Sequence, residues 1–338
     1  MVYKKLLSLL VMFFVLSCSS ENRPSLFEFT GVVMTVPYRI LIGHPLSDND
    51  IVRVTKTIHG VFEEIDSILN RWNPNSEVSK INRLKAHVPF SISQQMQEFL
   101  NRCAYFVNLS KGQFDPTIEP LQCYWKGCFE YGMLPNQEVL NELIPTIGWN
   151  NIIIKDGKVQ KKHDMTGLDF GGIAKGYAVD LMIQRISSLE FTSLYVDWGG
   201  EIRTTELHPE GRPWRVYVRD PENQDSINAI AILTLCNESL ATSGDYLQKW
   251  TLGNKTYTHV IDLETMQPLL LSENTITSVS VKSQECLIAD AVATILMMSK
   301  DLEHAKVQAD EFMKHQLISE CWLKTHANGE ITHISCQN

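Results

Sequence analysis

The chain has 338 residues, of which 44% are hydrophobic and 20% are charged, as in an ordinary globular protein that buries one large core or two coupled lobes. Its formal net charge of -9 argues against a nucleic-acid partner, because a phosphate backbone demands a basic surface. Any anionic ligand must therefore be bound locally, and a divalent cation is the natural means.

The amino terminus is typical of a bacterial lipoprotein signal. Two lysines precede an apolar run over residues 6–16, which is too short to span a bilayer because a spanning helix needs about 20 residues. Cys18 follows at the position of an acylated cysteine. We therefore expect a signal peptide over residues 1–17, a lipidated tether over 18–27, and a protein lipid-anchored to a bacterial membrane, facing the periplasm or the cell exterior. An ordinary secretory signal with an incidental cysteine is the alternative.

The remaining residues, 28–338, alternate between predicted strands and helices. Apolar residues recur every three or four positions from Ile51 to Ile68 and predict a helix, with Ser47 as its N-cap. The other predicted elements are strands over 28–42 around Pro37, helices over 92–109 and 137–144, a hairpin of 152–154 and 158–161 around Asp156-Gly157, a helix over 173–188, strands over 193–197, 214–219, 229–235, 255–262 and 275–282, and a helix over 285–298.

A glycine-rich junction, LDFGGIAKGYAVD at residues 168–180, places Gly171 and Gly172 between the end of a predicted strand and the start of a helix. Glycine lets a phosphate approach the backbone, the first N–H groups of the helix supply donors, and Lys175 adds a positive charge. A tight turn without a ligand is the alternative. A second pair, Gly199-Gly200, also follows a predicted strand, which suggests an internal duplication.

Asp290 and Thr294 are four positions apart on a predicted helix, so a carboxylate and a hydroxyl lie on the same face. Two hard oxygen ligands suit Mg²⁺, which completes its shell with waters and substrate phosphates. The alternative is a surface charge and a hydroxyl bonded back to its own helix. Because the surrounding residues make this helix apolar nearly all round, we expect Asp290 to be buried and to need a partner.

Eight cysteines are present, so lipidation of Cys18 would leave an odd number that cannot all pair. Their spacing in the sequence leaves two disulfides possible, Cys123 with Cys128 and Cys321 with Cys336. The other three lie in apolar stretches and are expected to be buried core residues: Cys103, Cys236 and Cys286.

The glycine-rich junction resembles the ApbE family of flavin transferases, whose D-x-G-G-I-A-K-G-Y-A-x-D run it matches almost letter for letter. Four other stretches are similar to the same family in the same order: RWNPNSE at 71–77, GQFDPT at 112–117, THVID at 258–262 and ADAVAT at 289–294. The resemblance covers nearly the whole mature chain. It supports, more than periodicity does, an α+β fold with antiparallel sheets and packed helices.

The resemblance also implies a set of site residues. Mg²⁺ would be held by the carbonyl of Gly172 together with Asp290 and Thr294. The positions that would contact FAD are Met34, Trp72, Gln113, Phe114, Asp115, Asp169, Lys175 and Ile261. In physical terms Trp72 and Phe114 are able to stack on a planar ring, and Asp169 is able to accept a hydrogen bond from a ribose or adenine group. On residue type alone, Met34 and Ile261 favour plain core packing.

His259 is the candidate general base, since histidine is the side chain best suited to moving a proton near neutral pH. A lone histidine is usually structural, and the catalytic assignment comes from the family pattern, in which a His-x-Ile-Asp run meets the metal site. The family usually continues with Pro-x-Thr-Gly after this aspartate. This chain reads Leu263-Glu264-Thr265-Met266 instead, so the conformation of the following loop is not implied by the resemblance.

The function that the resemblance implies is Mg²⁺-dependent transfer of FMN from FAD to a threonine hydroxyl of an extracytoplasmic acceptor flavoprotein, with release of AMP. Expected acceptors are such proteins as subunits of the sodium-pumping NADH:quinone reductase or of Rnf complexes. Two alternatives stay open, a Mg²⁺-dependent FAD pyrophosphatase that releases FMN and AMP, and a flavin-binding lipoprotein without chemistry. A general base and a metal site argue against simple binding, whereas the same metal site serves both reactions.

Overall fold

The computed structural model describes residues 26–219, 229–244, 249–326 and 331–336. The predicted signal peptide, Cys18 and most of the predicted tether lie outside these residues. Within the described ranges, no helix has the combination of length and apolarity needed to cross a membrane.

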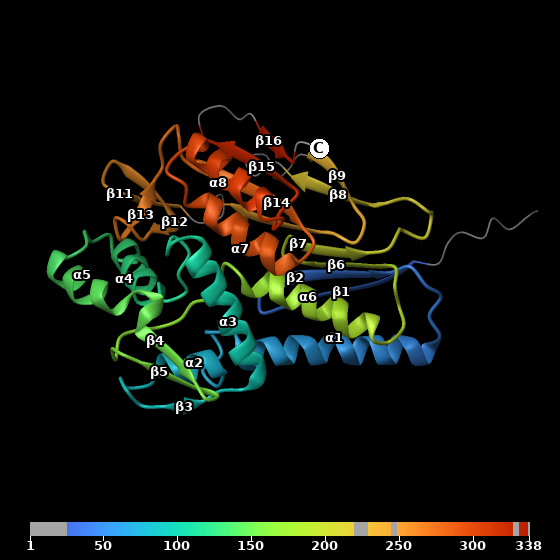
Figure 1. Ribbon diagram of the computed structural model, residues 1–338, viewed down its shortest axis with the longest axis horizontal. Helices are drawn as coiled ribbons and strands as arrows, with labels where there is room; N and C mark the ends of the chain where they lie inside the picture. The colour runs from blue at the N-terminus through green and yellow to red at the C-terminus, as the bar shows by residue number, and fades with distance from the viewer. Residues whose placement is uncertain (1–25, 220–228, 245–248, 327–330, 337–338) are drawn as a thin grey trace, which may run out of the picture.

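The centre of the molecule is an eight-stranded sheet in which every neighbouring pair is antiparallel (Figure 1). The strands lie in the order β1-β2-β6-β7-β10-β14-β15-β16. Their bounds are β1 Phe27–Val33, β2 Val36–Ile42, β6 Leu194–Trp198, β7 Glu201–Thr205, β10 Ser239–Gly244, β14 Ile276–Ser283, β15 Glu320–Thr325 and β16 Ile331–Ser335. This arrangement confirms the predicted α+β class with antiparallel sheets.

Both faces of this sheet are covered. Successive side chains along a strand point to opposite faces, and each face packs into its own hydrophobic core. On β2, Ile40 and Ile42 belong to the large core on the helical face, whereas Leu41 belongs to a smaller core on the other face. A hairpin of β8 (Trp214–Arg219) and β9 (Ala229–Leu235) closes that second face. The buried apolar area on both faces fixes the strand register, since a slip by one residue would exchange the two cores.

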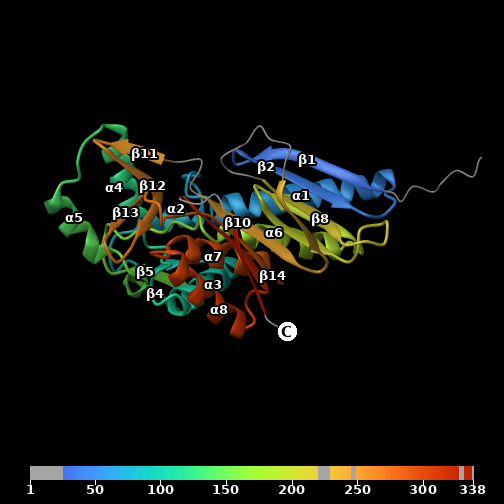
Figure 2. The same ribbon diagram turned by 90° about the horizontal axis from the view of Figure 1, so that it is seen from above.

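Helices cover the large core, as Figures 1 and 2 show from two directions. α6 packs on β6 and β7, α7 packs on β10 and β14, and the two helices lie against each other. α1 lies against α6, and α8 against α7 and β15. The helix bounds are α1 Asp48–Ile68, α2 Glu77–Asn82, α3 Gln94–Leu109, α4 Glu119–Glu130, α5 Gln137–Leu143, α6 Ala174–Ser187, α7 Cys286–Met297 and α8 Leu302–Lys314, with short 3-10 turns at Ile144–Thr146 and Trp149–Asn151.

Two three-stranded sheets complete the fold. One contains β3 (Phe90–Ser91), β5 (Lys158–Lys161) and β4 (Ile152–Lys155), and the other contains β11 (Lys249–Leu252), β12 (Lys255–Asp262) and β13 (Gln267–Leu270). The second of these packs on α4 through Phe129, whose ring stacks on Trp250 with centroids 4.9 Å apart. This aromatic contact holds β12, which carries His259, against the helical part of the molecule.

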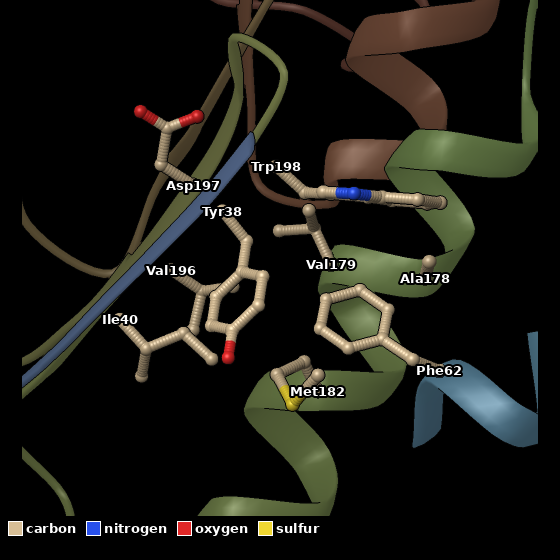
Figure 3. Close-up of a pocket in the computed structure, with 9 residues that line it drawn as sticks. All are labelled: Tyr38, Ile40, Phe62, Ala178, Val179, Met182, Val196, Asp197 and Trp198. Carbon is tan, nitrogen blue, oxygen red and sulfur yellow. The ribbon is translucent and has the colours of Figure 1, made fainter. Parts of the chain in front are cut away.

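Figure 3 shows a hollow between α1, α6 and strands β2 and β6 that aromatic side chains fill. The ring of Phe62 lies 5.0 Å from that of Tyr38 and 5.3 Å from that of Trp198, measured between centroids. No space for a water molecule is left among these side chains. The hollow is therefore part of the packed core and leaves no room for a ligand.

The elements with strong local signals form as predicted. Ser47 caps α1 in a capping box, with its hydroxyl accepting from the N–H of Asp50 and the Asp50 side chain accepting from the N–H of Ser47. The hairpin of β4 and β5 turns at Asp156 and Gly157, whose φ angles of 51° and 67° are those of a type I′ turn. The first hairpin turns at Met34 and Thr35, with φ angles of 50° and 64°, so Pro37 lies inside β2 and not at a break.

The predicted strand before the first glycine pair is absent. Residues 168–170 belong to no strand, and the nearest pairing is a single bridge between Ile118 and Gly167. The other pair, Gly199-Gly200, forms the tight turn of the β6–β7 hairpin. The two glycine pairs therefore have different surroundings, and they lend no support to an internal duplication.

Neither of the two disulfides that the spacing left open is formed, because all seven cysteines in the described residues are free. Cys103 and Cys286 are buried as expected, but Cys236 is only half-buried. Cys321 is buried in the core while Cys336 is exposed.

α6 and α7 cross at Gly176, which explains the third glycine of the junction. A Cβ atom at this position would lie 2.4 Å from the carbonyl oxygen of Cys286 and 2.8 Å from Cβ of Asp290. Real Cβ atoms do not approach backbone this closely, so any side chain would push the two helices apart. The close approach brings the backbone of α6 within hydrogen-bonding distance of side chains on α7.

We expect Gly176→Ala to lower the free energy of unfolding by about 1–3 kcal/mol, the usual cost of overpacking a core. Gly60→Ala is the matched control, because Gly60 lies in α1 with no atom near its added methyl group. There the same change should raise the free energy of unfolding by about 0.5–1 kcal/mol, since glycine is the poorer helix former. Urea unfolding measures both. Equal effects of the two substitutions would contradict the proposed crossing.

Candidate active site

The candidate site lies where α6 meets α7, and Asp290 on α7 is its buried acid. The side chain is 3% exposed, and its Oδ2 accepts a hydrogen bond from the N–H of Gly176 at 2.9 Å. Burial raises the pKa of Asp290, while the positive charge of Lys175 and the Gly176 hydrogen bond act to lower it. Asp290 is therefore the buried carboxylate that its apolar surroundings predicted, and within the described residues it has one hydrogen-bond donor.

A second acid, Asp180 on α6, fixes the start of α7. Its two oxygens accept from the N–H groups of Cys286 and Leu287, each at 2.9 Å, and Arg203 pairs with it at 2.5 Å. Glu285, the N-cap residue of α7, makes no side-chain capping bond, because its carboxylate pairs with Arg102. The last residue of the glycine-rich junction thus caps the helix that carries Asp290.

Thr294 lies one helical turn beyond Asp290 and faces the segment just before α6. Its Oγ1 lies 3.3 Å from the carbonyl oxygen of Gly172 and 3.4 Å from Oγ of Ser243. A Cβ atom at Gly172 would lie 2.8 Å from both Oγ1 and Cγ2 of Thr294, so this position also requires glycine. Gly172 and Thr294, which are far apart in sequence, are thus in contact as the resemblance implies.

These groups fit Mg²⁺. Asp290, Thr294 and the Gly172 carbonyl all offer hard oxygen atoms, the kind of ligand that Mg²⁺ requires. Two neighbouring ligands of an octahedral Mg²⁺ lie about 3 Å apart, and the Thr294 hydroxyl and the Gly172 carbonyl approach that spacing. The buried Asp290 carboxylate accepts from one N–H group among the described residues, which leaves an oxygen able to bind a cation.

Lys175 reaches away from the helix and pairs with Glu201, a residue that the sequence analysis did not single out. The Nζ–Oε1 distance is 2.5 Å, and the Glu201 side chain is 1% exposed. Burial raises the pKa of Glu201 to about 8, against the lowering effect of Lys175. Burial lowers the pKa of Lys175, but the charges of Glu201 and Asp290 outweigh that effect and raise it.

The backbone donors of the α6 N-terminus are partly used within the protein. The N–H of Gly171 donates to Asp169 at 2.6 Å, and that of Gly176 donates to Asp290. Within the described part of the chain, the N–H groups of Gly172 and Lys175 have no acceptor. These two are the donors that remain for an anion at this helix end.

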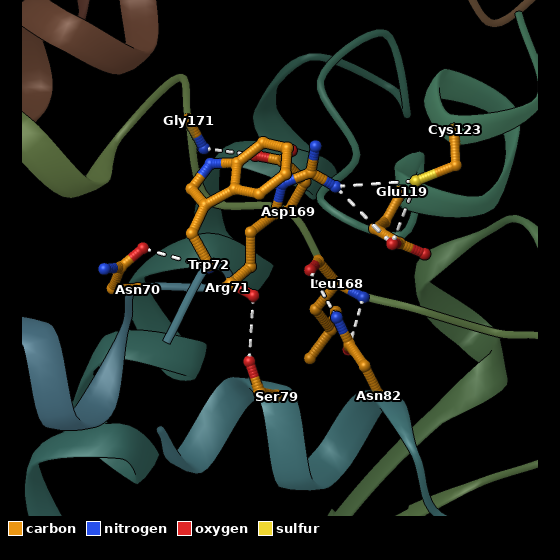
Figure 4. A network of polar contacts seen from close by, with 10 residues as sticks. All are labelled: Asn70, Arg71, Trp72, Ser79, Asn82, Glu119, Cys123, Leu168, Asp169 and Gly171. Atoms are coloured by element: carbon orange, nitrogen blue, oxygen red, sulfur yellow. Dashed lines mark hydrogen bonds and ion pairs between the residues drawn. The ribbon is translucent and has the colours of Figure 1, made fainter. Parts of the chain in front are cut away.

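Figure 4 shows the network that surrounds Asp169. Its Oδ2 pairs with Nε of Arg71 at 3.0 Å, while its Oδ1 accepts from Gly171. The guanidinium of Arg71 also lies 4.4 Å from the ring centroid of Trp72, whose side chain is 71% exposed. An exposed indole beside two fixed charges is able to stack on a planar aromatic ligand.

Three neighbouring predicted contacts are engaged within the protein. The amide of Gln113 donates to the carbonyl of Ile295 at 3.3 Å and accepts from Gln308 at 2.7 Å. Asp115 is buried and accepts from Thr117 and from the N–H of Trp149. The ring of Phe114 is 5% exposed and meets Phe106 edge-on in the core, so it offers no face for the stacking that its residue type suggested.

Met34 and Ile261 occupy different environments. Met34 lies in the β1–β2 turn and is partly buried against the large core. Ile261 is 4% exposed and packs with Trp125 and Leu140 in a small satellite core, as its residue type suggests.

His259 lies on β12, outside the central sheet. The pairing of β12 with β13 shifts register between Tyr257 and Ile261, which marks a bulge around the histidine. Bulges re-aim side chains and are common beside active sites. The next residue, Val260, packs on the large core, so this strand borders the core that contains α7.

The profile of the ApbE family matches residues 32–316, which is most of the chain. The chain therefore belongs to the ApbE family. A relative from Chlamydia pneumoniae, named FAD:protein FMN transferase, is 38% identical over 296 residues, covering 87% of this chain and 91% of the relative. A relative of the same name from Vibrio cholerae is 27% identical, with 84% of each chain covered. As a member of this family, the chain is a transferase.

Solved structures agree on the fold. The apo form of the flavinyl transferase ApbE from Pseudomonas stutzeri superposes with a TM-score of 0.78 at 24% identity, covering 92% of this chain and 94% of that one. An ApbE protein from Thermotoga maritima gives a TM-score of 0.77, with 91% and 96% covered. The ApbE fold thus extends over nearly the whole described chain.

In this ApbE-family chain, we expect Asp290→Asn to weaken Mn²⁺ binding by more than the roughly 10- to 100-fold that loss of an outer-shell partner costs. Thr294→Val should weaken it less, because a neutral oxygen contributes less to a divalent cation than a carboxylate does. Titration calorimetry without FAD measures both, and Asp164→Asn at an exposed ion pair is the control. Unchanged binding in Asp290→Asn would remove this residue from the cation site.

Proposed function

We propose that this protein is a Mg²⁺-dependent FAD:protein FMN transferase that attaches FMN to a threonine hydroxyl of an extracytoplasmic acceptor flavoprotein. The observation that carries the proposal is the contact between Gly172 and Thr294 beside the buried Asp290, an oxygen site at the start of a helix with two open N–H groups. The names of the relatives support the choice of FAD as donor.

In the proposed reaction, the threonine oxygen attacks the FMN-side phosphorus of FAD and forms the new P–O bond. The bond from that phosphorus to the bridging oxygen breaks, AMP leaves with that oxygen, and the hydroxyl proton passes to a base. Bound to Asp290, Thr294 and the Gly172 carbonyl, Mg²⁺ would neutralise negative charge on the pyrophosphate.

The chain's own residues position the substrate. The N–H groups of Gly172 and Lys175 point from a helix N-terminus, where the backbone dipole favours a phosphate. The exposed indole of Trp72 offers a stacking surface, which Arg71 supports from one side. Held between these groups, the pyrophosphate is oriented for displacement.

His259 is the base in this proposal. It lies on a strand that borders the core around α7, at a bulge in the strand pairing. A neutral imidazole takes the proton from the acceptor hydroxyl as the new bond forms. Acceptors such as subunits of the sodium-pumping NADH:quinone reductase or of Rnf complexes fit this chemistry.

We expect the purified protein to add the mass of FMN to an acceptor domain with an Asp-Gly-x-Thr-type site when FAD and Mg²⁺ are present. His259→Asn should bind FAD and melt normally, yet lose transfer by roughly 100- to 10,000-fold, as when a general base is removed. His333→Asn, at a histidine on the edge strand β16, is the control.

The alternatives give other results in the same assay. Release of FMN and AMP without labelling of the acceptor would identify a pyrophosphatase, and FAD binding without any product would identify a binding protein. A destabilised but fully active His259→Asn would take this histidine out of the mechanism.

We also propose that the protein works outside the cytoplasm, held to a membrane by acyl chains on Cys18. A lipid anchor would keep the enzyme beside membrane-bound acceptors. We expect Cys18→Ser to abolish palmitate labelling and membrane retention in cells, because the acyl chains require that sulfur. Labelling that persists in the variant would contradict the anchor.

A further inference from the structure

We propose that Glu201 is a positioning residue that holds Lys175 away from Asp290, so that the Asp290 carboxylate stays free to bind a divalent cation. The inference deepens the proposed function and rests on its metal site. It assigns a role to a buried acid outside the glycine-rich junction that carries Lys175.

The contact between Lys175 and Glu201 is short and desolvated on the acid's side. Their Nζ and Oε1 atoms lie 2.5 Å apart, and Glu201 is almost fully buried. Within the described residues, the second oxygen of Glu201, Oε2, has no hydrogen-bond partner. A buried carboxylate with one oxygen unsatisfied depends strongly on its cation, so this ion pair is strongly held.

Lys175 nevertheless interacts electrostatically with two buried acids. The charges of Glu201 and of Asp290 both stabilise its ammonium form, and Lys175 is the main charge that opposes the effect of burial on Asp290. Among the described residues, only Glu201 forms an ion pair with it. In the described structure Asp290 takes its hydrogen bond from the backbone of Gly176, through Oδ2. Its other oxygen, Oδ1, is thus left for a cation.

Backbone geometry fixes Glu201 in this place. It is the first residue of β7 and follows Gly199 and Gly200, whose φ angles of 68° and 100° favour glycine. A Cβ atom at Gly199 would lie 2.5 Å from Cγ1 of Val36, and it would also come within 3.8 Å of Cδ of Lys175. The turn therefore places Glu201 at the start of β7, where Lys175 passes within ordinary contact distance of Gly199 and pairs with the acid.

Without the charge of Glu201, the Lys175 ammonium group would turn to Asp290, the other acid whose charge already acts on it. Lys175 would then donate to Asp290 and compete with the divalent cation for the same carboxylate. The second glycine pair and the acid that follows it thus protect the metal site, although neither supplies a ligand.

The test is a double-mutant cycle on Mn²⁺ affinity, measured by titration calorimetry without FAD. We expect Glu201→Gln to weaken binding by about 10- to 100-fold, the usual cost of losing an outer-shell partner. Adding Lys175→Met should restore the affinity to within a few fold of wild type, because the competitor is gone. Glu238→Gln, which breaks another Glu–Lys pair at 3.0 Å, is the control and should bind Mn²⁺ normally. Melting temperatures verify that each variant is folded.

Three outcomes would overturn the inference. Wild-type affinity in Glu201→Gln would show that Lys175 stays clear of Asp290 unaided. A double variant as weak as Glu201→Gln would mean that Glu201 acts on the cation directly and not through the lysine. Absence of Mn²⁺ binding in the wild-type protein would overturn the proposed metal-dependent function as well, whereas the first two outcomes leave that function intact.

Discussion

The close approach of α6 and α7 is the constraint on which the site depends. Gly172 and Gly176 are one helical turn apart, and a side chain at either position would collide with α7. Because both are glycines, the carbonyl of Gly172 just before α6 meets Thr294, and the N–H of Gly176 within α6 meets Asp290. The glycine-rich junction is therefore first a packing motif between two helices, and its capacity to bind a cation and phosphates follows from that packing.

Charges in this contact are costly, and the fold provides specific partners for them. Burial of an ionised carboxylate costs several kcal/mol unless hydrogen bonds or an opposite charge offset it. In the part of the chain that the structure describes, Asp180 has two backbone N–H groups and Arg203 as partners, whereas Asp290 has a single N–H. The difference separates a structural acid, which is satisfied by the protein, from an acid that still has capacity for a ligand. Lys175 pairs with Glu201, and its charge also acts on Asp290, so it links the charges of the site.

Sequence reasoning succeeded where the signal is local. The capping box of Ser47 and the Asp156-Gly157 turn depend on neighbouring residues, so their elements could be predicted closely. β10 is composed of small and polar residues and is a strand because β7 and β14 lie on either side of it, which no local pattern reveals. For the same reason the burial of Phe114 and the pairing of Glu201 with Lys175 could not be predicted, since both come from contacts between distant segments.

Helix α8 is different, because its signal is local and could have been found. Its N-cap Asp301 and its buried Ala305 and Ala309 form a helical pattern in the sequence.

The measurement that tests the account most directly is anomalous diffraction from crystals of the protein soaked in Mn²⁺. The account predicts one strong peak at the α6–α7 crossing, within coordination distance of Asp290 Oδ1, Thr294 Oγ1 and the Gly172 carbonyl oxygen, with Lys175 still paired to Glu201. A peak elsewhere on the protein, or a Lys175 ammonium bonded to Asp290 with no metal at the crossing, would contradict it.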